Sequence, residues 1–328
     1  MKPIIAISMG DPGGIGPEII LKTLFETGTD SSVPVIFGNE TVFRYYADIL
    51  DQSVDLNVIK SAVEAEADKI NLIDCTEFSK EDIKPGTLHA INGRAVMESI
   101  EAGIEACLSG EAKAIVTAPI SKEAINLAGY NVPGHTEFLA EKTGTENVLM
   151  MLVSGSFRVA LATIHIPLKD VPAQITADNL KKRLGILYDS LMNDFGIEKP
   201  SVACLGLNPH SGDGGVIGRE EIEIIEPVVK ELAESGLDVS GPFAADGFFG
   251  KRLQNNYDAV LATYHDQGLI PFKALTFGKG VNFTAGLPII RTSPDHGTAF
   301  DIAGKNVADH SSFTAAYQLA VELNQNRN

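Results

Sequence analysis

Three apolar runs in this sequence end at or shortly before a histidine. The runs and their histidines are Val159–Ile164 with His165, Val202–Leu207 with His210, and Ala259–Thr263 with His265. Short runs rich in Val, Leu and Ala are typical of buried parallel strands, whose carboxyl ends meet at one edge of a sheet. Three neutral imidazoles at that edge can bind a catalytic metal and leave a position for substrate or water. Because a single histidine after a strand is more often structural or solvated, the metal-site prediction depends on the recurrence.

Polar, turn-rich residues follow two of these runs, at 208–215 and at 265–268. Functional groups tend to lie on loops that a rigid scaffold positions. Asp266 in the second segment, and Asp246 upstream of the third run, are candidates for a general base or for orienting a histidine. A solvated carboxylate on a loop is the commoner role for either residue.

A basic stretch lies between Gln267 and Pro294, where 28 residues contain no Asp or Glu although the chain carries a net charge of −17. A local positive field suits a small phosphorylated or carboxylated substrate. Arg291 is suited to bidentate contact with such an anion, and Lys273 is favoured for the same site. Lys279 lies between two glycines and is favoured as a solubilising residue.

The segment Pro133–Phe138 predicts a turn that leads into a helix. His135 and Thr136 would then lie near the helix N-terminus, where they can donate hydrogen bonds to an anion. This motif is a weak predictor when it is taken alone.

A glycine-rich segment, Gly10–Glu18, follows the first predicted strand and precedes a helix. It matches neither the G-x-G-x-x-G fingerprint nor the phosphate loop that ends in G-K-[ST]. Two interpretations therefore stay open: a nucleotide-binding loop, or glycines that tighten the connection between strand and helix.

The composition excludes several classes of function. The net charge of −17 disfavours nucleic-acid binding, which needs Lys and Arg to neutralise phosphates. Three scattered cysteines, Cys75, Cys107 and Cys204, indicate neither a disulfide framework nor a thiolate metal site. The sequence contains no run of about 20 apolar residues for a membrane span and no signal-peptide cleavage region, so a cytoplasmic location is expected.

Apolar runs alternate with amphipathic segments along the 328 residues, which predicts an α/β fold with mostly parallel sheets. Further strands are expected at 4–9, 33–37, 114–118, 148–153 and 287–290. Helices are expected at 17–27, 93–109, 176–195, 218–235 and 311–325.

The combined motifs resemble those of the 4-hydroxythreonine-4-phosphate dehydrogenase family, in order and over essentially the whole chain. The segments that carry the resemblance are 9–18, 133–138, 207–215, 264–268 and 280–303. The resemblance implies that a divalent metal such as zinc, magnesium or cobalt binds to His165, His210 and His265. It implies that the phosphorylated substrate binds to His135, Thr136, Lys273, Asn282 and Arg291. The candidates for catalytic groups are Lys273, Asp246 and Asp266.

The resemblance also implies a two-domain fold like that of isocitrate and isopropylmalate dehydrogenases. Residues 1–120 plus 266–328 would form a nucleotide-binding domain, and residues 121–265 a domain for substrate, metal and dimerisation. By analogy with those enzymes, NAD or NADP would bind to Gly10, Asp11, Gly13, Gly14, His296, Gly297, Thr298 and Asp301. The active site would be shared between the subunits of a homodimer.

The expected activity is NAD-dependent oxidation of 4-phosphohydroxy-L-threonine to a 3-keto acid, which decarboxylates to 3-amino-2-oxopropyl phosphate in vitamin B6 biosynthesis. One alternative is a dehydrogenase of D-threonate or D-erythronate 4-phosphate in sugar-acid catabolism. Another is a non-catalytic regulator that binds metal and phosphate. A metallohydrolase acting on a phosphate ester is least favoured, because the sequence offers no second metal site.

Overall fold

The structure is a computed structural model that describes residues 2–28, 31–132, 134–276 and 278–327, and it divides into two compact units. The first unit contains residues 1–146 and 287–326, and the second contains residues 147–286. The chain therefore leaves the first unit once and returns to it, as the two-domain prediction expects.

The sheet of the first unit is parallel throughout and has the strand order β3-β4-β2-β1-β5-β12. Its strands are β1 (Ile4–Ser8), β2 (Val33–Gly38), β3 (Leu56–Ile59), β4 (Ile70–Asp74), β5 (Ala114–Thr117) and β12 (Ile290–Pro294). The central strands β2 and β5 are buried along their whole length. Burial of both faces explains why these strands read as continuous apolar runs instead of alternating ones.

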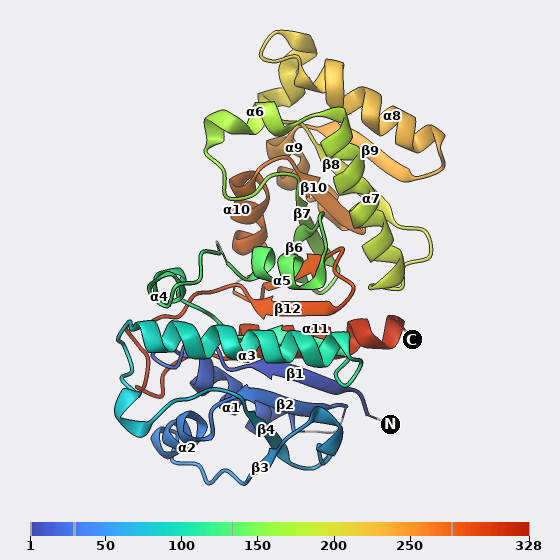
Figure 1. Ribbon diagram of the computed structural model, residues 1–328. Helices are drawn as coiled ribbons and strands as arrows, with labels where there is room; N and C mark the ends of the chain where they lie inside the picture. The colour runs from blue at the N-terminus through green and yellow to red at the C-terminus, as the bar shows by residue number, and fades with distance from the viewer. Residues whose placement is uncertain (1, 29–30, 133, 277, 328) are drawn as a thin grey trace. The chain divides into compact units, whose positions relative to one another are not determined.

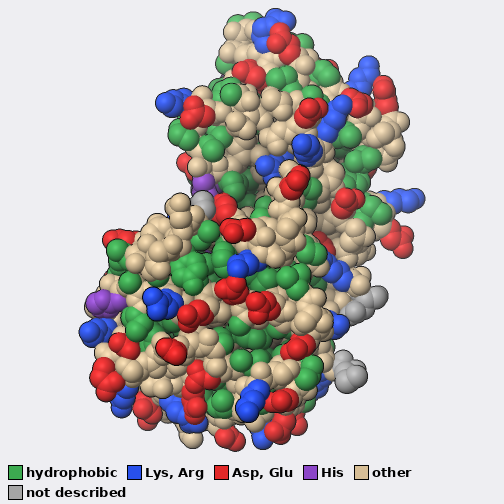
Figure 2. Space-filling model, in the orientation of Figure 1, with side chains coloured by type: hydrophobic (Ala, Val, Ile, Leu, Met, Phe, Trp, Pro, Cys, Tyr) green, Lys and Arg blue, Asp and Glu red, His purple; other side chains and the backbone are tan. Residues whose placement is uncertain are grey.

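The helices of the first unit cover this sheet. They are α1 (Gly16–Thr27), α2 (Glu40–Ile49), α3 (Ala90–Leu108), α4 (Lys122–Leu127), α5 (His135–Thr143) and α11 (Ser311–Asn326). Helix α3 packs along β1 and β2, and α11 packs on β5 and β12 (Figure 1). Figure 2 shows acidic and basic side chains interspersed over the visible face of this unit. The apolar faces of the helices are thus turned to the sheet and the charged faces to water.

The sheet of the second unit has the order β11-β6-β7-β10-β8-β9. Its strands are β6 (Leu149–Ser154), β7 (Phe157–Leu161), β8 (Ser201–Leu205), β9 (Asp238–Phe243), β10 (Ala259–Ala262) and β11 (Val281–Ala285). Strand β6 is antiparallel to β7 and β11, whereas β7, β10, β8 and β9 run parallel. The α/β class with mostly parallel strands is confirmed. The strands that precede the three histidines are neighbours whose carboxyl ends lie at one edge.

The helices of the second unit lie on both sides of its strands. They are α6 (Val171–Gln174), α7 (Ala177–Asn193), α8 (Glu226–Glu234), α9 (Ala245–Gly250) and α10 (His265–Thr276). In Figure 1 the strands lie between α10, which contacts β7 and β10, and α7, which contacts β6 and β11. The core beneath α9 and α10 is a cluster of buried aliphatic and aromatic side chains that includes Leu161, Phe248, Val260 and Phe272.

The boundaries between the units differ from those expected. They fall after residues 146 and 286, whereas the sequence interpretation placed them after residues 120 and 265. Residues 121–146 stay with the first unit because α4 and α5 pack against α3. Residues 266–286 stay with the second unit because α10 packs on β7 and β10, and β11 pairs with β6. Among the helices that the structure describes, none has the length and apolar composition needed to cross a bilayer.

Candidate functional site

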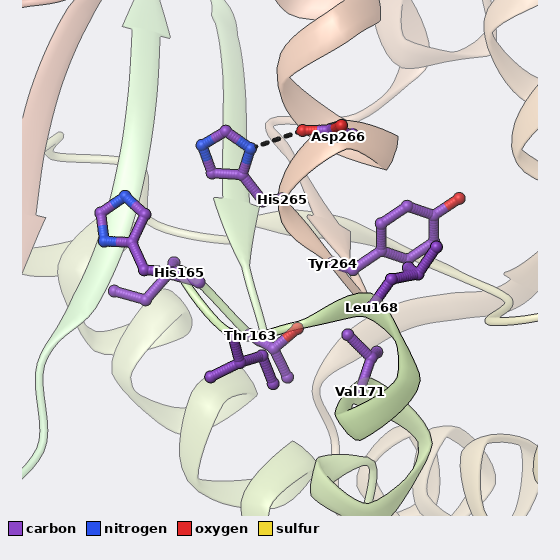
Figure 3. A pocket seen from close by; sticks show the side chains of 9 residues that line it. Thr163, His165, Leu168, Val171, Tyr264, His265 and Asp266 are labelled. Atoms are coloured by element: carbon purple, nitrogen blue, oxygen red, sulfur yellow. Dashed lines mark hydrogen bonds and ion pairs between the residues drawn. The ribbon is translucent and has the colours of Figure 1, made fainter.

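Two of the three predicted metal ligands lie together in the second unit. The ring centroids of His165 and His265 are 5.7 Å apart (Figure 3). Two imidazoles on one tetrahedral ion have centroids roughly 5 Å apart, because each nitrogen lies about 2 Å from the metal. Both rings face a pocket of about 290 Å³, which is lined by Thr163, Ile164, His165, Ile166, Leu168, Val171, Tyr264, His265 and Asp266. Its residues follow the carboxyl ends of β7 and β10.

Asp266 orients one of these imidazoles. Its Oδ1 lies 2.7 Å from Nδ1 of His265, the contact drawn as a dashed line in Figure 3. A carboxylate at Nδ1 favours the proton there, which leaves Nε2 with its lone pair as the ligand atom. Of the two roles considered for Asp266, the contact corresponds to the orienting one.

The segment 265–268 is the first turn of α10 and not the loop that its polar residues indicated. A Cβ on Gly268 would lie 2.7 Å from Leu161 and 2.9 Å from Val159. This glycine therefore serves close packing of α10 on β7. Composition alone does not separate a glycine of this kind from a glycine in a turn.

His210 lies in a turn of unusual handedness, Pro209–Gly215. Six successive residues from His210 to Gly215 have positive φ, with values of 53°, 51°, 77°, 46°, 62° and 92°. Left-handed backbone costs about 1–2 kcal/mol for each residue that has a Cβ, and here His210, Ser211 and Asp213 all adopt it. Strain of this kind persists only where the surroundings enforce it. His210 is exposed and does not line the pocket of the other two histidines.

A buried carboxylate enforces this turn. Glu221 is 2% exposed, and its Oε1 and Oε2 accept hydrogen bonds from Asn208 N at 2.7 Å and Asn208 Nδ2 at 2.9 Å. A Cβ on Gly212 would lie 2.7 Å from the same carboxylate. Glu221 opens a π-helical turn, Glu221–Ile225, ahead of α8. Sequence reasoning missed this residue because an acidic side chain in a predicted helix gives no sign of burial.

Within the described part of the chain, no group of three His, Cys, Asp or Glu side chains is arranged to hold a metal ion. The sheet places the segments of His165, His265 and His210 on successive strands, β7, β10 and β8. It brings the imidazoles of His165 and His265 together, but His210 does not join them in that pocket.

Two positively charged side chains, those of Arg291 and Lys122, act on His135 at the start of α5, and we call this pair the cationic pole. Arg291, the second residue of β12, is 2% exposed and donates from Nε and Nη2 to Thr117 Oγ1 at 3.0 and 2.7 Å. Burial lowers the pKa of Arg291, and Glu137 opposes that shift. The pKa of His135 lies well below its usual value. Burial is the main cause, and the positive charges of Arg291 and Lys122 add to it. His135 is therefore neutral at pH 7 and close to both cations.

The N-terminus of α5 has no side-chain cap among the described residues, because Gly134 occupies the N-cap position. Uncapped backbone N–H groups at a helix start are suited to bind an anion. The Nε2 of His135 is buried without a hydrogen-bond partner among the described residues. Predicted residues His135, Thr136 and Arg291 are thus all in the first unit; Pro133 of the same motif lies outside the described residues.

Sequence reasoning missed Lys122, which begins α4. A Cβ on Gly134 would lie 3.6 Å from Lys122 Cε, so the lysine stem reaches the start of α5. Lys122 is exposed, and it forms no ion pair with any residue that the structure describes. The sequence gives no signal for this role, because Lys122 is followed directly by Glu123 and only the fold places it beside His135.

The glycine-rich loop before α1 is packed inside the first unit. All residues of 10–18 are buried, and a Cβ on Gly13 would lie 2.4 Å from Thr87 O. Asp11 is 1% exposed, and its Oδ1 accepts from Gly13 N at 2.8 Å and Asn92 Nδ2 at 3.0 Å. Burial raises the pKa of Asp11 to about 6. Of the two interpretations left open, the packing supports the tight connection, and Asp11 points inward.

The second predicted nucleotide segment lies directly against this loop. Ile15 N donates to Thr298 O at 3.0 Å, and a Cβ on Gly14 would lie 2.8 Å from the same oxygen. Unlike the glycine loop, residues 296–301 are exposed or half-buried, and Nε2 of His296 is buried without a partner among the described residues. The first unit also contains a pocket of about 620 Å³. It is lined by Lys22, Phe25, Glu26, Leu50, Gln52, Asn306, Ala308 and His310.

The remaining predicted residues lie in the second unit. Lys273 is exposed in the last turn of α10, and Asn282 is half-buried in β11 with its Oδ1 unpaired among the described residues. Asp246 is exposed in the first turn of α9, which packs against the Pro209–Gly215 turn.

Comparison with known proteins identifies close relatives along the whole chain. The family model described as pyridoxal phosphate biosynthetic protein PdxA matches residues 30–320. The 4-hydroxythreonine-4-phosphate dehydrogenase of Prosthecochloris aestuarii is 47% identical over 98% of this chain and 97% of its own length, and that of Bacteroides thetaiotaomicron is 44% identical over 98% and 89%. The crystal structure of the enzyme so named from Klebsiella pneumoniae superposes with a TM-score of 0.89 at 38% identity and covers 99% of each chain.

Proposed function

This chain belongs to the family of the pyridoxal phosphate biosynthetic protein PdxA, and we propose that it is a 4-hydroxythreonine-4-phosphate dehydrogenase. It would oxidise the secondary alcohol of 4-phosphohydroxy-L-threonine to a 3-keto acid, which loses carbon dioxide to give 3-amino-2-oxopropyl phosphate. The observation that carries the proposal is the pair His165 and His265 in one pocket of a chain with these relatives.

The donors of this pocket fit a divalent transition metal. His165 and His265 present imidazoles at a separation suited to one ion, and Asp266 fixes the orientation of the second ring. We infer that His210 completes the set. A bound cation would polarise the substrate hydroxyl and lower its pKa. Zinc and cobalt suit imidazole ligands better than magnesium, which prefers oxygen.

The cationic pole of the first unit would hold the substrate phosphate. Arg291 supplies a fixed positive charge, the start of α5 supplies backbone N–H groups, and neutral His135 can donate from its ring. The buried guanidinium needs no reorganisation when the anion arrives, because Thr117 already holds it. Lys273 and Asn282 of the second unit are proposed as the further substrate contacts, with Lys273 and Asp246 as candidates for proton transfer.

NAD or NADP would accept the hydride, and the exposed segment 296–301 is its proposed contact. The unpartnered Nε2 of His296 is a polar atom that a ligand can satisfy. Gly10, Asp11, Gly13 and Gly14 would support that segment from beneath instead of meeting the nucleotide themselves, because all four are buried. Gly14 packs against Thr298, and Asp11 and Gly13 lie against Asn92.

A homodimer with a shared site is proposed from the surface around the histidines. Each histidine segment carries exposed aliphatic side chains, which are Ile166, Leu168, Val216, Ile217 and Ile270. Val216 is 83% exposed and Leu168 69%. Contiguous apolar patches on a surface are typical of protein interfaces, and these five side chains are proposed to form one. A second subunit that covers them would bring its own histidines to the same region.

The test is NADH formation by the purified protein with added cobalt or zinc. We expect 4-phosphohydroxy-L-threonine to reduce NAD, D-threonate 4-phosphate to be a poorer substrate, and chelation to stop the reaction until metal is restored. Faster turnover of the sugar acid would reassign the substrate. Binding of metal and substrate without NAD reduction would favour a regulator, and release of inorganic phosphate without NAD a hydrolase.

A further inference from the structure

We propose that Gln267 is a positioning residue that clamps the carboxyl ends of β8 and β10 together, and thereby places the segments that carry His210 and His265. The inference rests on the proposed function for the role of those histidines. The clamp itself is defined by hydrogen bonds within the second unit.

The carboxamide of Gln267 uses both of its ends. Its Oε1 accepts from the backbone N of Thr263 at 2.7 Å and from Thr263 Oγ1 at 2.9 Å. Its Nε2 donates to the carbonyl oxygen of Gly206 at 2.6 Å. Thr263 follows β10 and lies two residues before His265, whereas Gly206 follows β8 and lies four residues before His210.

This bridge begins where the backbone pairing of the two strands stops. The register of β8 with β10 runs from Val202 with Ala259 to Cys204 with Leu261. Beyond that point the Gln267 side chain spans from one strand end to the other. The end of β8 still bonds to β9 through Gly206 N and Phe243 O at 2.8 Å, but its backbone pairing with β10 has stopped there. The half-buried amide bridge therefore sets the separation of the segments that follow β8 and β10.

A second tie extends the clamp to β7. Thr163 Oγ1 donates to the carbonyl oxygen of Thr263 at 2.8 Å, and Thr163 lies two residues before His165. Thr163 and Thr263 are 6% and 0% exposed. The same pattern, L-A-T-x-H, occurs at 161–165 and 261–265. All three histidine segments are therefore connected through Thr263 and Gln267 a few residues ahead of the imidazoles.

The chain offers a matched control at the opposite ends of the same two strands. Ser201 starts β8, and both its N and its Oγ donate to Oδ2 of Asp258 at 2.8 Å. Asp258 immediately precedes β10. Ser201→Ala thus removes a polar tie between β8 and β10 far along both strands from the histidines.

The experiment compares Gln267→Met with Ser201→Ala by two measurements. Amide hydrogen exchange of the metal-free protein should rise at residues 206–215 in Gln267→Met and stay at the wild-type level there in Ser201→Ala. Titration with Co²⁺, followed by its ligand-field absorbance, should give a dissociation constant about 10–100-fold weaker for Gln267→Met, as for other residues that orient metal ligands. Ser201→Ala should bind Co²⁺ within about twofold of wild type, although both variants lose polar ties between the same strands.

Wild-type exchange at 206–215 and wild-type Co²⁺ affinity in Gln267→Met would overturn the clamp. Equal weakening of Co²⁺ binding in both variants would also overturn it, because the effect would then be one of general stability. If Gln267→Met does not fold, Gln267→Asn, whose amide is one methylene too short to reach Gly206, is measured in its place. Failure of the wild-type protein to bind Co²⁺ overturns the metal site of the proposed function, whereas the exchange data still decide the clamp.

Discussion

The two units prepare their candidate groups in opposite ways. In the first unit Arg291 is 2% exposed and already hydrogen-bonded to Thr117. In the second unit the side chain of His265 is 37% exposed, and His165 and His210 lie on the surface. The cationic pole is complete once one chain folds, whereas the histidine edge brings two imidazoles together and presents the third on a strained turn.

The two units therefore lose the hydration of their polar groups at different stages. The first unit loses it during folding, and the second when a ligand or subunit binds. Burying Arg291 and Asp11 penalises their charged forms in the folded protein before any ligand is present. The exposed histidines keep their hydration until a cation or a second subunit replaces it. Substitutions in the first unit should therefore change stability and substrate affinity together, whereas those in the second should change metal binding with little effect on stability.

The largest effect is expected for His210→Ala. Turnover should fall at least about a hundredfold, because loss of a ligand exceeds the 10–100-fold cost of losing a residue that only orients one. The melting temperature should stay near the wild-type value, since His210 is exposed. His89→Ala, at an exposed histidine before α3, is the control. Full activity in His210→Ala would remove this residue from the metal site.

Asp11→Asn should change how stability depends on pH. Between pH 3.8 and about 6 the folded state binds more protons at Asp11 than the unfolded state does, so the free energy of unfolding falls as pH rises. A shift of this size corresponds to about 3 kcal/mol. Relative to wild type, the variant should gain about that amount between pH 4 and pH 7, as measured by urea unfolding. Parallel pH profiles would contradict the burial argument.

Arg291→Lys should weaken substrate binding more than it slows chemistry. An ammonium cannot form the bidentate contact of a guanidinium, so the Michaelis constant for the phosphorylated substrate should rise about 10–100-fold. Steady-state kinetics would separate KM from kcat. The melting temperature would show how far the replacement of this buried cation lowers the stability of the protein. An unchanged KM would place the phosphate elsewhere.

The smallest effect is expected for Lys122→Met. The lysine is exposed, so its charge is screened, and loss of an exposed charge–anion contact changes affinity by only about 1 kcal/mol or less. KM should rise a few-fold and the rise should shrink in high salt. Lys279→Met removes an exposed lysine of the second unit and is the matched control. Equal effects of both substitutions would mean that Lys122 acts only through the overall surface charge and not through a contact with the substrate.

The strands before the histidines were predictable because their apolar runs are continuous. Strand β10 lies within the run 259–263, whereas β7 and β8 overlap the runs 159–164 and 202–207 and begin one or two residues earlier. Strand β12 begins at Ile290, where the expected run ends. Strands β3, β4, β9 and β11 were missed, because they are edge or half-polar strands whose residues alternate or include Asn, Asp and Gly.

The candidate site was only partly predictable, for a physical reason. Residue types indicated imidazoles at a sheet edge and cations for an anion, but a sequence does not state which side chains are buried. Glu221 and Gln267 read as ordinary polar residues and Asp11 as a nucleotide contact, and the hydrogen bonds of all three arise only when distant segments pack. The left-handed turn at His210 was equally invisible, since only its glycines are usual in that conformation.

The handedness of that turn determines where an imidazole points. A turn wound in the usual sense would project side chain 210 toward the opposite side of the segment, even with every residue unchanged. The left-handed backbone conformation of the turn therefore sets the direction in which the His210 side chain points. A β-branched residue at 211 or 213, which resists positive φ, would redirect His210 without altering a single atom of its ring.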